Sequence, residues 1–276
     1  ISPVTKRFDN KVVVITGASS GIGKALVYEF ARRGAKIVAA ARSADQLSAM
    51  QHEVNELFKS EVLAVPTDVG IEKDCKNLIE QTIDKFGKID ILINNAGVSM
   101  RALFNDLHLD VIRKLMDVNF WGTAYCSKYA LPFLLSSKGS LVGVSSIAGY
   151  VGLPARSGYS ASKSAMQGLL GVIRTENLKQ GLHVLIACPG FTASNIRFKA
   201  LTSDGSQQNE TPRNEEKMMS AEKVAKKIAD AIVNRKRSLV LTTEGKLSIL
   251  LNKFIPATVD KLVFKKMSKE INSPFK

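Results

Sequence analysis

Hydrophobic and polar positions follow two different periods along the first 190 residues. Short runs that are apolar throughout are each followed by a longer segment in which apolar residues recur every three or four positions. The first pattern is typical of strands buried on both faces and the second of amphipathic helices. The predicted strands are residues 12–16, 36–41, 62–66, 89–94, 140–145 and 183–187, and the predicted helices are residues 22–33, 44–59, 72–86, two stretches between 110 and 137, and 157–179.

This alternation predicts the fold class. Apolar strands that are each followed by a helix form parallel sheets whose two faces are covered. We therefore expect an α/β fold, a single Rossmann-type doubly wound parallel sheet with helices on both faces. The sequence shows no internal repeat and no linker long enough to separate a second domain, so one domain is expected over residues 1–276.

The pattern changes after residue 190. Residues 191–220 include the polar run KALTSDGSQQNETPRNEE, and a long excursion of this kind in a compact domain is more often functional than accidental. We expect it to form a substrate loop. A helix over residues 220–234 and a strand over 238–242 should follow. Residues 246–276 should form a basic helical extension, in two pieces separated by Pro256.

Composition and charge narrow the class of protein. With 45% hydrophobic and 23% charged residues, the chain is neither disordered, collagen-like nor disulfide-dense. Its three cysteines lie far apart, which favours a reducing, cytoplasmic compartment. Lys and Arg number 39 against 25 Asp and Glu, a net charge of +14, and residues 221–276 hold 13 of the basic and five of the acidic residues. This excess permits nucleic acid, an anionic membrane surface or a phosphorylated ligand as partner.

Membrane and metal signals are weak in the sequence. No stretch approaches the roughly 20 apolar residues that span a bilayer, and no signal peptide is visible. Because the sequence starts at Ile1 rather than Met, a targeting or anchoring segment could precede it. The three histidines (His52, His108 and His183) are scattered, so no metal site is predicted.

A glycine-rich turn joins the first predicted strand to the first predicted helix. It reads Thr-Gly-Ala-Ser-Ser-Gly-Ile-Gly over residues 16–23. Glycines let the backbone approach a pyrophosphate, and the helix N-terminus directs amide hydrogens at it, so the turn predicts a dinucleotide site. The second strand ends in Arg42 without a carboxylate, which favours the 2′-phosphate of NADP(H) over the free ribose of NAD(H).

Tyr159 and Lys163 stand four positions apart at the start of a predicted helix and share one face. A phenol with a pKa near ~10 is a poor acid–base catalyst at neutral pH, and an adjacent ammonium should lower that pKa. The same spacing also occurs by chance, as in Tyr28 and Arg32. Ser146 ends a predicted strand at the edge where ligands bind in such sheets, and its hydroxyl could hold a substrate oxygen.

From about residue 8 to 245 the chain resembles the classical short-chain dehydrogenase/reductase (SDR) family. Seven elements in order carry this resemblance: residues 16–23, Asp68, Asn94-Asn95-Ala96-Gly97, Asn119, Ser146, Tyr159-Ser160-Ala161-Ser162-Lys163 and Pro189-Gly190. Residues 41–43, residues 144–149 and the extended C-terminus look most similar to the hydroxysteroid dehydrogenase and ketosphinganine reductase branch.

The resemblance implies four catalytic residues. Tyr159 would donate a proton to the carbonyl during reduction and act as base during alcohol oxidation. Ser146 would hold the substrate oxygen. Lys163 would bind the nicotinamide ribose and tune Tyr159, and Asn119 would fix a water that links Lys163 to solvent.

The resemblance also implies a cofactor site. Its residues would be Gly17, Ser19, Ser20, Gly21, Ile22, Gly23, Arg42, Asp68, Val69, Asn95, Ala96, Gly97, Tyr159, Lys163, Pro189, Gly190, Thr192 and Ser194. Two of these depart from the family pattern. Ser20 stands where NADP-dependent members often have a basic residue, and Ser194 stands where a threonine is expected.

We therefore expect an NADP(H)-dependent oxidoreductase that interconverts a lipophilic secondary alcohol and a ketone. The alternatives are a non-catalytic NADP(H)-binding redox sensor and a membrane-associated protein. A homodimer or homotetramer is expected by family analogy. Nucleic acid is not expected, because no aromatic-basic platform accompanies the charge. The basic extension packs on the domain or a neighbouring subunit, or lies on an anionic membrane as an amphipathic helix.

Overall fold

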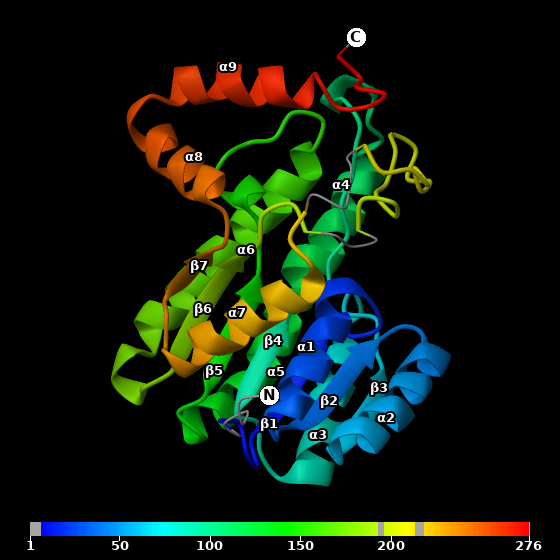
Figure 1. Ribbon diagram of the computed structural model, residues 1–276, viewed down its shortest axis with the longest axis vertical. Helices are drawn as coiled ribbons and strands as arrows, with labels where there is room; N and C mark the ends of the chain where they lie inside the picture. Colours follow the sequence, from blue (N-terminus) through cyan, green and yellow to red (C-terminus); the bar gives the residue numbers. More distant parts are fainter. Residues whose placement is uncertain (1–6, 193–195, 213–217, 276) are drawn as a thin grey trace.

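The computed structural model describes residues 7–192, 196–212 and 218–275. Its strands form one parallel sheet in the order β3-β2-β1-β4-β5-β6-β7 (Figure 1). The chain first builds outward from β1 to β3 and then outward from β4 to β7, so the strand order reverses between β1 and β4. The bounds are β1 Val12–Thr16, β2 Lys36–Ala41, β3 Val62–Pro66, β4 Ile91–Asn94, β5 Ser140–Val144, β6 His183–Cys188 and β7 Ser238–Val240.

Helices connect the strands and cover both faces of the sheet. This arrangement confirms the predicted doubly wound α/β fold. The helices are α1 Gly21–Arg32, α2 Ala44–Phe58, α3 Glu72–Phe86, α4 Leu109–Leu115, α5 Gly122–Ser136, α6 Ser157–Glu176, α7 Ala221–Val233, α8 Thr243–Phe254 and α9 Pro256–Met267. Short turns are η1 Phe104–Asp106, η3 Ile147–Gly149 and η4 Leu178–Gln180, and a π-helical turn, η2 Met116–Trp121, joins α4 to α5.

Alternate residues of the central strands build two separate cores. Val13 and Ile15 of β1 pack with α1, α2 and α7 on one face, whereas Val12 and Val14 pack with α3, α5 and α6 on the other. This two-residue alternation follows from the pleat of a strand. Because both faces are buried, β1 is apolar along its whole length, which is why the sequence predicted it well.

Most predicted bounds agree with the structure to within a few residues. The run over residues 89–94 begins earlier than β4, because Ile89 is fully buried but its carbonyl accepts a hydrogen bond from Ser137 Oγ at 2.8 Å rather than from a neighbouring strand. The C-terminal extension starts at Thr243, where the side chain of Thr242 caps α8 by accepting from the Gly245 amide at 3.1 Å.

Helices α8 and α9 lie beyond the carboxyl edge of the sheet, at the top of Figure 1. Helix α8 ends at Phe254 and Pro256 is the first residue of α9, as the sequence predicted. Only Val259 and Met267 of α9 are buried. Within the described part of the chain, no helix is both long and apolar enough to cross a membrane.

Candidate active site

The glycine-rich turn between β1 and α1 is packed too tightly to accept side chains. A Cβ atom on Gly23 would lie 2.0 Å from the carbonyl oxygen of Gly17, and one on Gly17 would lie 2.8 Å from the Cα of Ala96. Gly17 also has a φ of +66°, which favours glycine. The turn therefore holds the start of α1 close to the ends of β1 and β4.

Asn95 fastens this turn to the end of β4. Its Nδ2 donates to the carbonyl oxygens of Thr16 at 2.9 Å and Gly17 at 3.3 Å. The Thr16 hydroxyl accepts in turn from the amides of Asn95 and Ala96, both at 3.0 Å. Ser20 begins α1 without a side-chain cap, so its helix amides are not occupied by that hydroxyl. These amides suit a pyrophosphate.

The ends of β2 and β3 lie next to this turn. Arg42 follows β2 directly, is exposed and lines the same cavity as Gly17. After β3, Asp68 accepts from the Gly70 amide at 3.0 Å, which shapes the loop that presents Val69 to the cavity. The residues predicted to bind the adenosine end of a dinucleotide therefore come from three neighbouring strand ends.

Asn119 lies in the π-helical turn between α4 and α5 and is fully buried. Its amide joins two segments, because Oδ1 accepts from the Val98 amide and Nδ2 donates to Val98 O and to Ser162 Oγ, all at 2.9 Å. π-Helical turns are rare and occur frequently at functional sites. Here the turn places Asn119 behind Gly97, where a Cβ would lie 3.1 Å from Asn119 Oδ1 and 3.3 Å from Lys163 Nζ.

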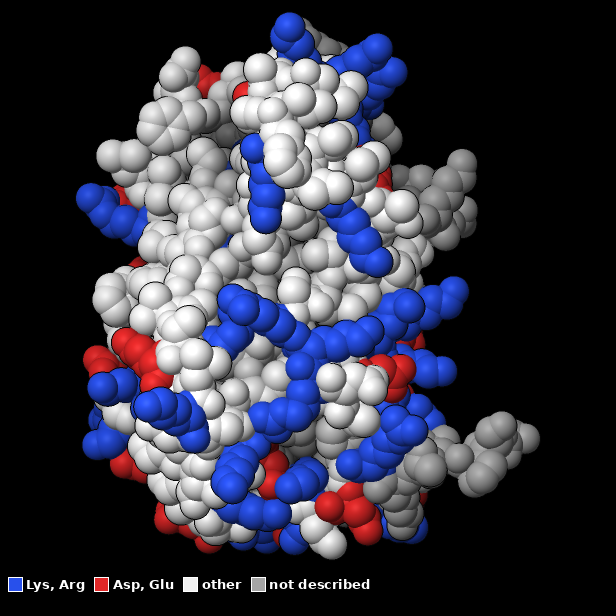
Figure 2. Space-filling view, turned by 90° about the vertical axis from the view of Figure 1, so that its left-hand side faces the viewer, with Lys and Arg blue, Asp and Glu red and all other residues white. Residues whose placement is uncertain are grey.

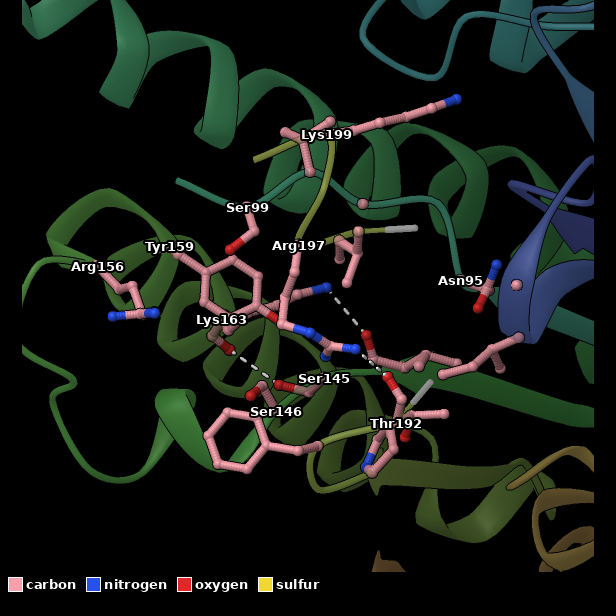
Figure 3. A pocket seen from close by; sticks show the side chains of 18 of the residues that line it. Asn95, Ser99, Ser145, Ser146, Arg156, Tyr159, Lys163, Thr192, Arg197 and Lys199 are labelled. Atoms are coloured by element: carbon pink, nitrogen blue, oxygen red, sulfur yellow. Dashed lines mark hydrogen bonds between the residues drawn. The ribbon is translucent and has the colours of Figure 1, made fainter. Parts of the chain in front are cut away.

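Ser146 and Tyr159 face each other at the carboxyl end of β5 (Figure 3). Ser146 caps η3, since its Oγ accepts from the Ala148 amide at 3.2 Å. Tyr159 lies in the first turn of α6. Burial raises the pKa of the Tyr159 phenol, and this outweighs the hydrogen bond from Ser146 and the nearby charges of Arg156 and Arg197, which lower it.

Lys163 lies one helical turn after Tyr159 and is 3% exposed. Its Nζ donates to Val144 O at 3.0 Å and lies 5.9 Å from the centre of the Tyr159 ring. Burial lowers the pKa of Lys163 to about 8. The lowered pKa of Tyr159 that the sequence predicts is therefore absent from this structure, in which desolvation dominates both groups.

One cavity of about 1410 Å³ brings most of the predicted site residues together. Those lining it are Gly17, Ser19, Ser20, Gly21, Ile22, Arg42, Asp68, Val69, Asn95, Ala96, Gly97, Ser146, Tyr159, Lys163, Pro189, Gly190 and Thr192. Gly23 and Asn119 support the wall from behind. Ser194 lies outside the described residues.

Three charged residues near the site were not singled out from the sequence. Arg156, Arg197 and Glu270 all line the cavity. Figure 3 shows Arg197 reaching toward Thr192, whose carbonyl oxygen accepts from Arg197 Nη2 at 2.7 Å. Arg156 immediately precedes α6 and stands three positions before Tyr159. This spacing is visible in the sequence and could have identified Arg156 as a neighbour of the site. Glu270 carries no local signal, because only the path of the C-terminal extension brings it here.

Comparison with known proteins identifies the family. The family model for short chain dehydrogenases matches residues 11–204. The chain belongs to the short-chain dehydrogenase/reductase family. This result confirms the family to which the motifs around Gly17, Tyr159 and Lys163 were similar.

Relatives in this SDR family include hydroxysteroid dehydrogenase-like proteins. "11-beta-hydroxysteroid dehydrogenase-like 2" of Arabidopsis thaliana is 42% identical over 187 residues, which is 67% of this chain and 60% of the relative. "Dehydrogenase/reductase SDR family protein 7-like" of Dictyostelium discoideum is 33% identical over 270 residues, 96% of this chain and 84% of the relative. The matched region spans less than two thirds of the plant protein.

Solved structures share the fold. A short chain dehydrogenase/reductase from Burkholderia phymatum in complex with NAD has a TM-score of 0.81 at 24% identity, covering 91% of this chain and 96% of its own. An alcohol dehydrogenase from Thermococcus sibiricus complexed with 5-hydroxy-NADP has a TM-score of 0.74 at 23% identity, covering 84% and 96%. At these sequence identities, the similarity shows a shared fold and nothing more.

Proposed function

We propose that this SDR protein is an NADP(H)-dependent oxidoreductase that interconverts a lipophilic secondary alcohol and its ketone. The observation that carries the proposal is the meeting of Ser146, Tyr159 and Lys163 in the same cavity as the glycine-rich turn. Fold alone would not support an activity, whereas these residues combine an oxygen-binding hydroxyl, a proton-carrying phenol and a cation beside a dinucleotide cradle.

Each reacting residue has a defined task in this proposal. When bound, the nicotinamide supplies a hydride to the carbonyl carbon in reduction and takes one back in alcohol oxidation. Ser146 donates a hydrogen bond to the substrate oxygen, and Tyr159 gives its phenolic proton to that oxygen. In the opposite direction, Tyr159 accepts the proton. Lys163 holds the nicotinamide ribose, while Asn119 fixes the segment around Val98 that borders the site.

The preference for NADP(H) rests on the end of β2. Arg42 is exposed at the cavity, and the residues beside it, Ala41 and Ser43, carry no carboxylate that would repel a 2′-phosphate. A planar guanidinium makes paired hydrogen bonds with phosphate. Asp68 lies after β3, where it would contact the adenine.

A lipophilic substrate is supported by the walls at the other end of the cavity. Apolar side chains from three segments line it there, namely Val151, Leu153, Ile196, Leu201, Val263 and Met267. The relatives named for hydroxysteroids are consistent with such a compartment. Segments 98–104, 149–158, 191–219 and the C-terminal extension all contribute residues that line the cavity.

Peripheral membrane contact through α8 and α9 is a second proposal, which is compatible with the first. Leu250 and Leu262 are more than half exposed, and Phe254 is 75% exposed. Figure 2 shows a largely uncharged surface at the level of these helices, with Lys and Arg side chains around it. Exposed apolar side chains bordered by lysines suit an anionic lipid surface. We also propose, by analogy with the family, that the chain forms a homodimer or homotetramer through α5 and α6.

The activity is tested by following NADPH consumption with steroid, keto-lipid, sugar and quinone panels and repeating the assay with NADH. Tyr159→Phe should keep NADPH affinity and lose about 10²- to 10⁴-fold in turnover, because the proton donor is gone. Tyr129→Phe is the matched control, since its hydroxyl bonds Glu72 at the surface, outside the cavity. Undiminished turnover by Tyr159→Phe would contradict the mechanism, and NADPH binding without turnover of any compound would favour the redox-sensor alternative.

A further inference from the structure

A buried carboxylate lies between two buried guanidinium groups at the substrate end of the cavity. The Glu270 side chain is 3% exposed, and its Oε2 accepts from Arg156 Nη2 at 2.7 Å and lies 3.6 Å from Arg101 Nε. The Arg101 and Arg156 side chains are 6% and 10% exposed. A carboxylate is buried at this depth only when cations compensate its lost hydration.

The two arginines belong to segments that frame the catalytic tyrosine. Arg156 directly precedes α6, which carries Tyr159. Arg101 follows β4, and its neighbour Ala102 donates its amide to the carbonyl oxygen of Ala155 at 3.0 Å. Ala155 has a φ of +59°, an uncommon conformation for a residue with a side chain. The turn that presents Arg156 is therefore held by the segment that presents Arg101.

Glu270 belongs to a different part of the chain, the residues just after α9. This part is tied down at further points: the Ile271 carbonyl accepts from Arg101 Nη2, and Asn272 Nδ2 donates to Glu210 Oε2 at 2.9 Å. Lys266, Met267 and Glu270 line the cavity. Residues 266–272 therefore include one wall of the substrate compartment, which is lined by Lys266, Met267, Lys269 and Glu270.

Helix α9 adds further contacts to this wall, such as that of Lys266 Nζ, which lies 5.6 Å from the centre of the Phe191 ring. Most apolar side chains of α9 face away from the protein, and its buried residues are Val259 and Met267. Lys266 pairs with Glu244 of α8, which belongs to the same extension. The contacts of Glu270 with Arg156 and Arg101 thus join the end of the extension to the segments on either side of Tyr159.

We propose that Glu270 is a positioning residue that determines substrate specificity, because its carboxylate, paired with Arg156 and Arg101, holds residues 266–272 as the outer wall of the substrate compartment. The proposal rests on the oxidoreductase function given above. A large ketone needs this wall to align its carbonyl with Tyr159, whereas a small ketone can reach Tyr159 without touching it. Cofactor binding takes place at the other end of the cavity and does not depend on the wall.

The test compares Glu270→Gln with the wild type on the full chain. Losing one partner of a buried ion pair leaves uncompensated charge, so hydrogen exchange of amides in residues 263–275 should accelerate by about tenfold or more. With 5α-androstane-3,17-dione as the large probe, KM should rise about tenfold while kcat changes less than about twofold. The KM for cyclohexanone and the affinity for NADPH should stay unchanged, because neither uses the wall.

Two further variants separate positioning from general damage. Asp260→Asn removes an exposed carboxylate from α9 of the same extension and should behave as the wild type. Glu270→Asp keeps the charge and should restore most of the exchange protection and of the affinity for the large ketone. It also serves as the folded comparison if Glu270→Gln is poorly folded. A role for side-chain size alone would give the opposite result, because Glu270→Gln keeps the size of the side chain and Glu270→Asp shortens it.

Unchanged exchange over residues 263–275 in Glu270→Gln would overturn the proposal, and so would an equal rise in KM for both ketones. If the wild type reduces neither ketone nor any other compound, the proposed oxidoreductase function fails. The exchange measurement needs no substrate and still decides whether Glu270 holds the wall.

Discussion

Burial governs the protonation of the two titratable side chains at the centre of the site. It raises the pKa of Tyr159 and lowers that of Lys163 to about 8. At neutral pH the phenol therefore carries its proton, the form that a reduction needs. The hydrogen bond from Ser146 acts in the opposite direction and favours the phenolate. In the proposed mechanism, Ser146 would thus help Tyr159 to act as the base in alcohol oxidation.

Arg42 provides a residue-level prediction about the cofactor. In Arg42→Ala the dissociation constant of NADPH should increase by about 10- to 100-fold, because charge-assisted hydrogen bonds to the 2′-phosphate are lost. The dissociation constant of NADH should change little. Titrations followed by cofactor fluorescence measure both values. Equal weakening of the two cofactors would show that Arg42 does not recognise the 2′-phosphate.

At the scale of elements, the turn between β1 and α1 combines close packing with ligand binding. Gly23 lets α1 begin against the backbone of Gly17, and Asn95 ties the same turn to β4. The π-helical turn acts similarly on the other face, where it directs Asn119 into the protein between Val98 and Ser162. In both elements the unusual local backbone positions side chains around the cavity.

Gly23→Ala tests the packing of this turn. The added methyl would collide with the Gly17 carbonyl, so the free energy of unfolding should fall by about 1–3 kcal/mol and NADPH affinity should fall with it. Gly168→Ala is the control, because a Cβ on Gly168 of α6 meets nothing within 4 Å. That change should raise the free energy of unfolding by about 0.5–1 kcal/mol. Denaturant unfolding measures both, and equal stability of the two variants would contradict the packing argument.

At the scale of the whole molecule, most of the excess positive charge and several exposed apolar side chains lie in residues 221–276. The net charge is +14, and one positive charge, Arg42, has a proposed role at the cofactor phosphate. Helices α8 and α9 carry several exposed apolar residues among lysines, and α9 also lines the cavity. A surface that binds lipid would therefore lie next to the compartment proposed for a lipophilic substrate.

Vesicle co-sedimentation tests this surface on the intact chain. Phe254→Glu should reduce binding to phosphatidylserine-containing vesicles by about tenfold, because an exposed apolar anchor is replaced by a charge that anionic lipid repels. Leu57→Glu on α2 is the control, since Leu57 is 60% exposed but lies far from the extension in sequence and on a different element. Equal sedimentation of Phe254→Glu and the wild type would remove the membrane proposal.

The sequence alone was sufficient to predict the order of strands and helices along the chain, the glycine-rich turn, and the placement of Tyr159 and Lys163 on one helix. These features are encoded locally: buried parallel strands are apolar throughout, helices repeat at 3.6 residues, and Tyr159 and Lys163 lie on one helix. The tertiary structure decided the direction of the Tyr159 pKa shift, because desolvation depends on every segment packed around the phenol. It also decided that Glu270 meets Arg101 and Arg156, since residues more than 100 positions apart are brought together only by the path of the folded chain.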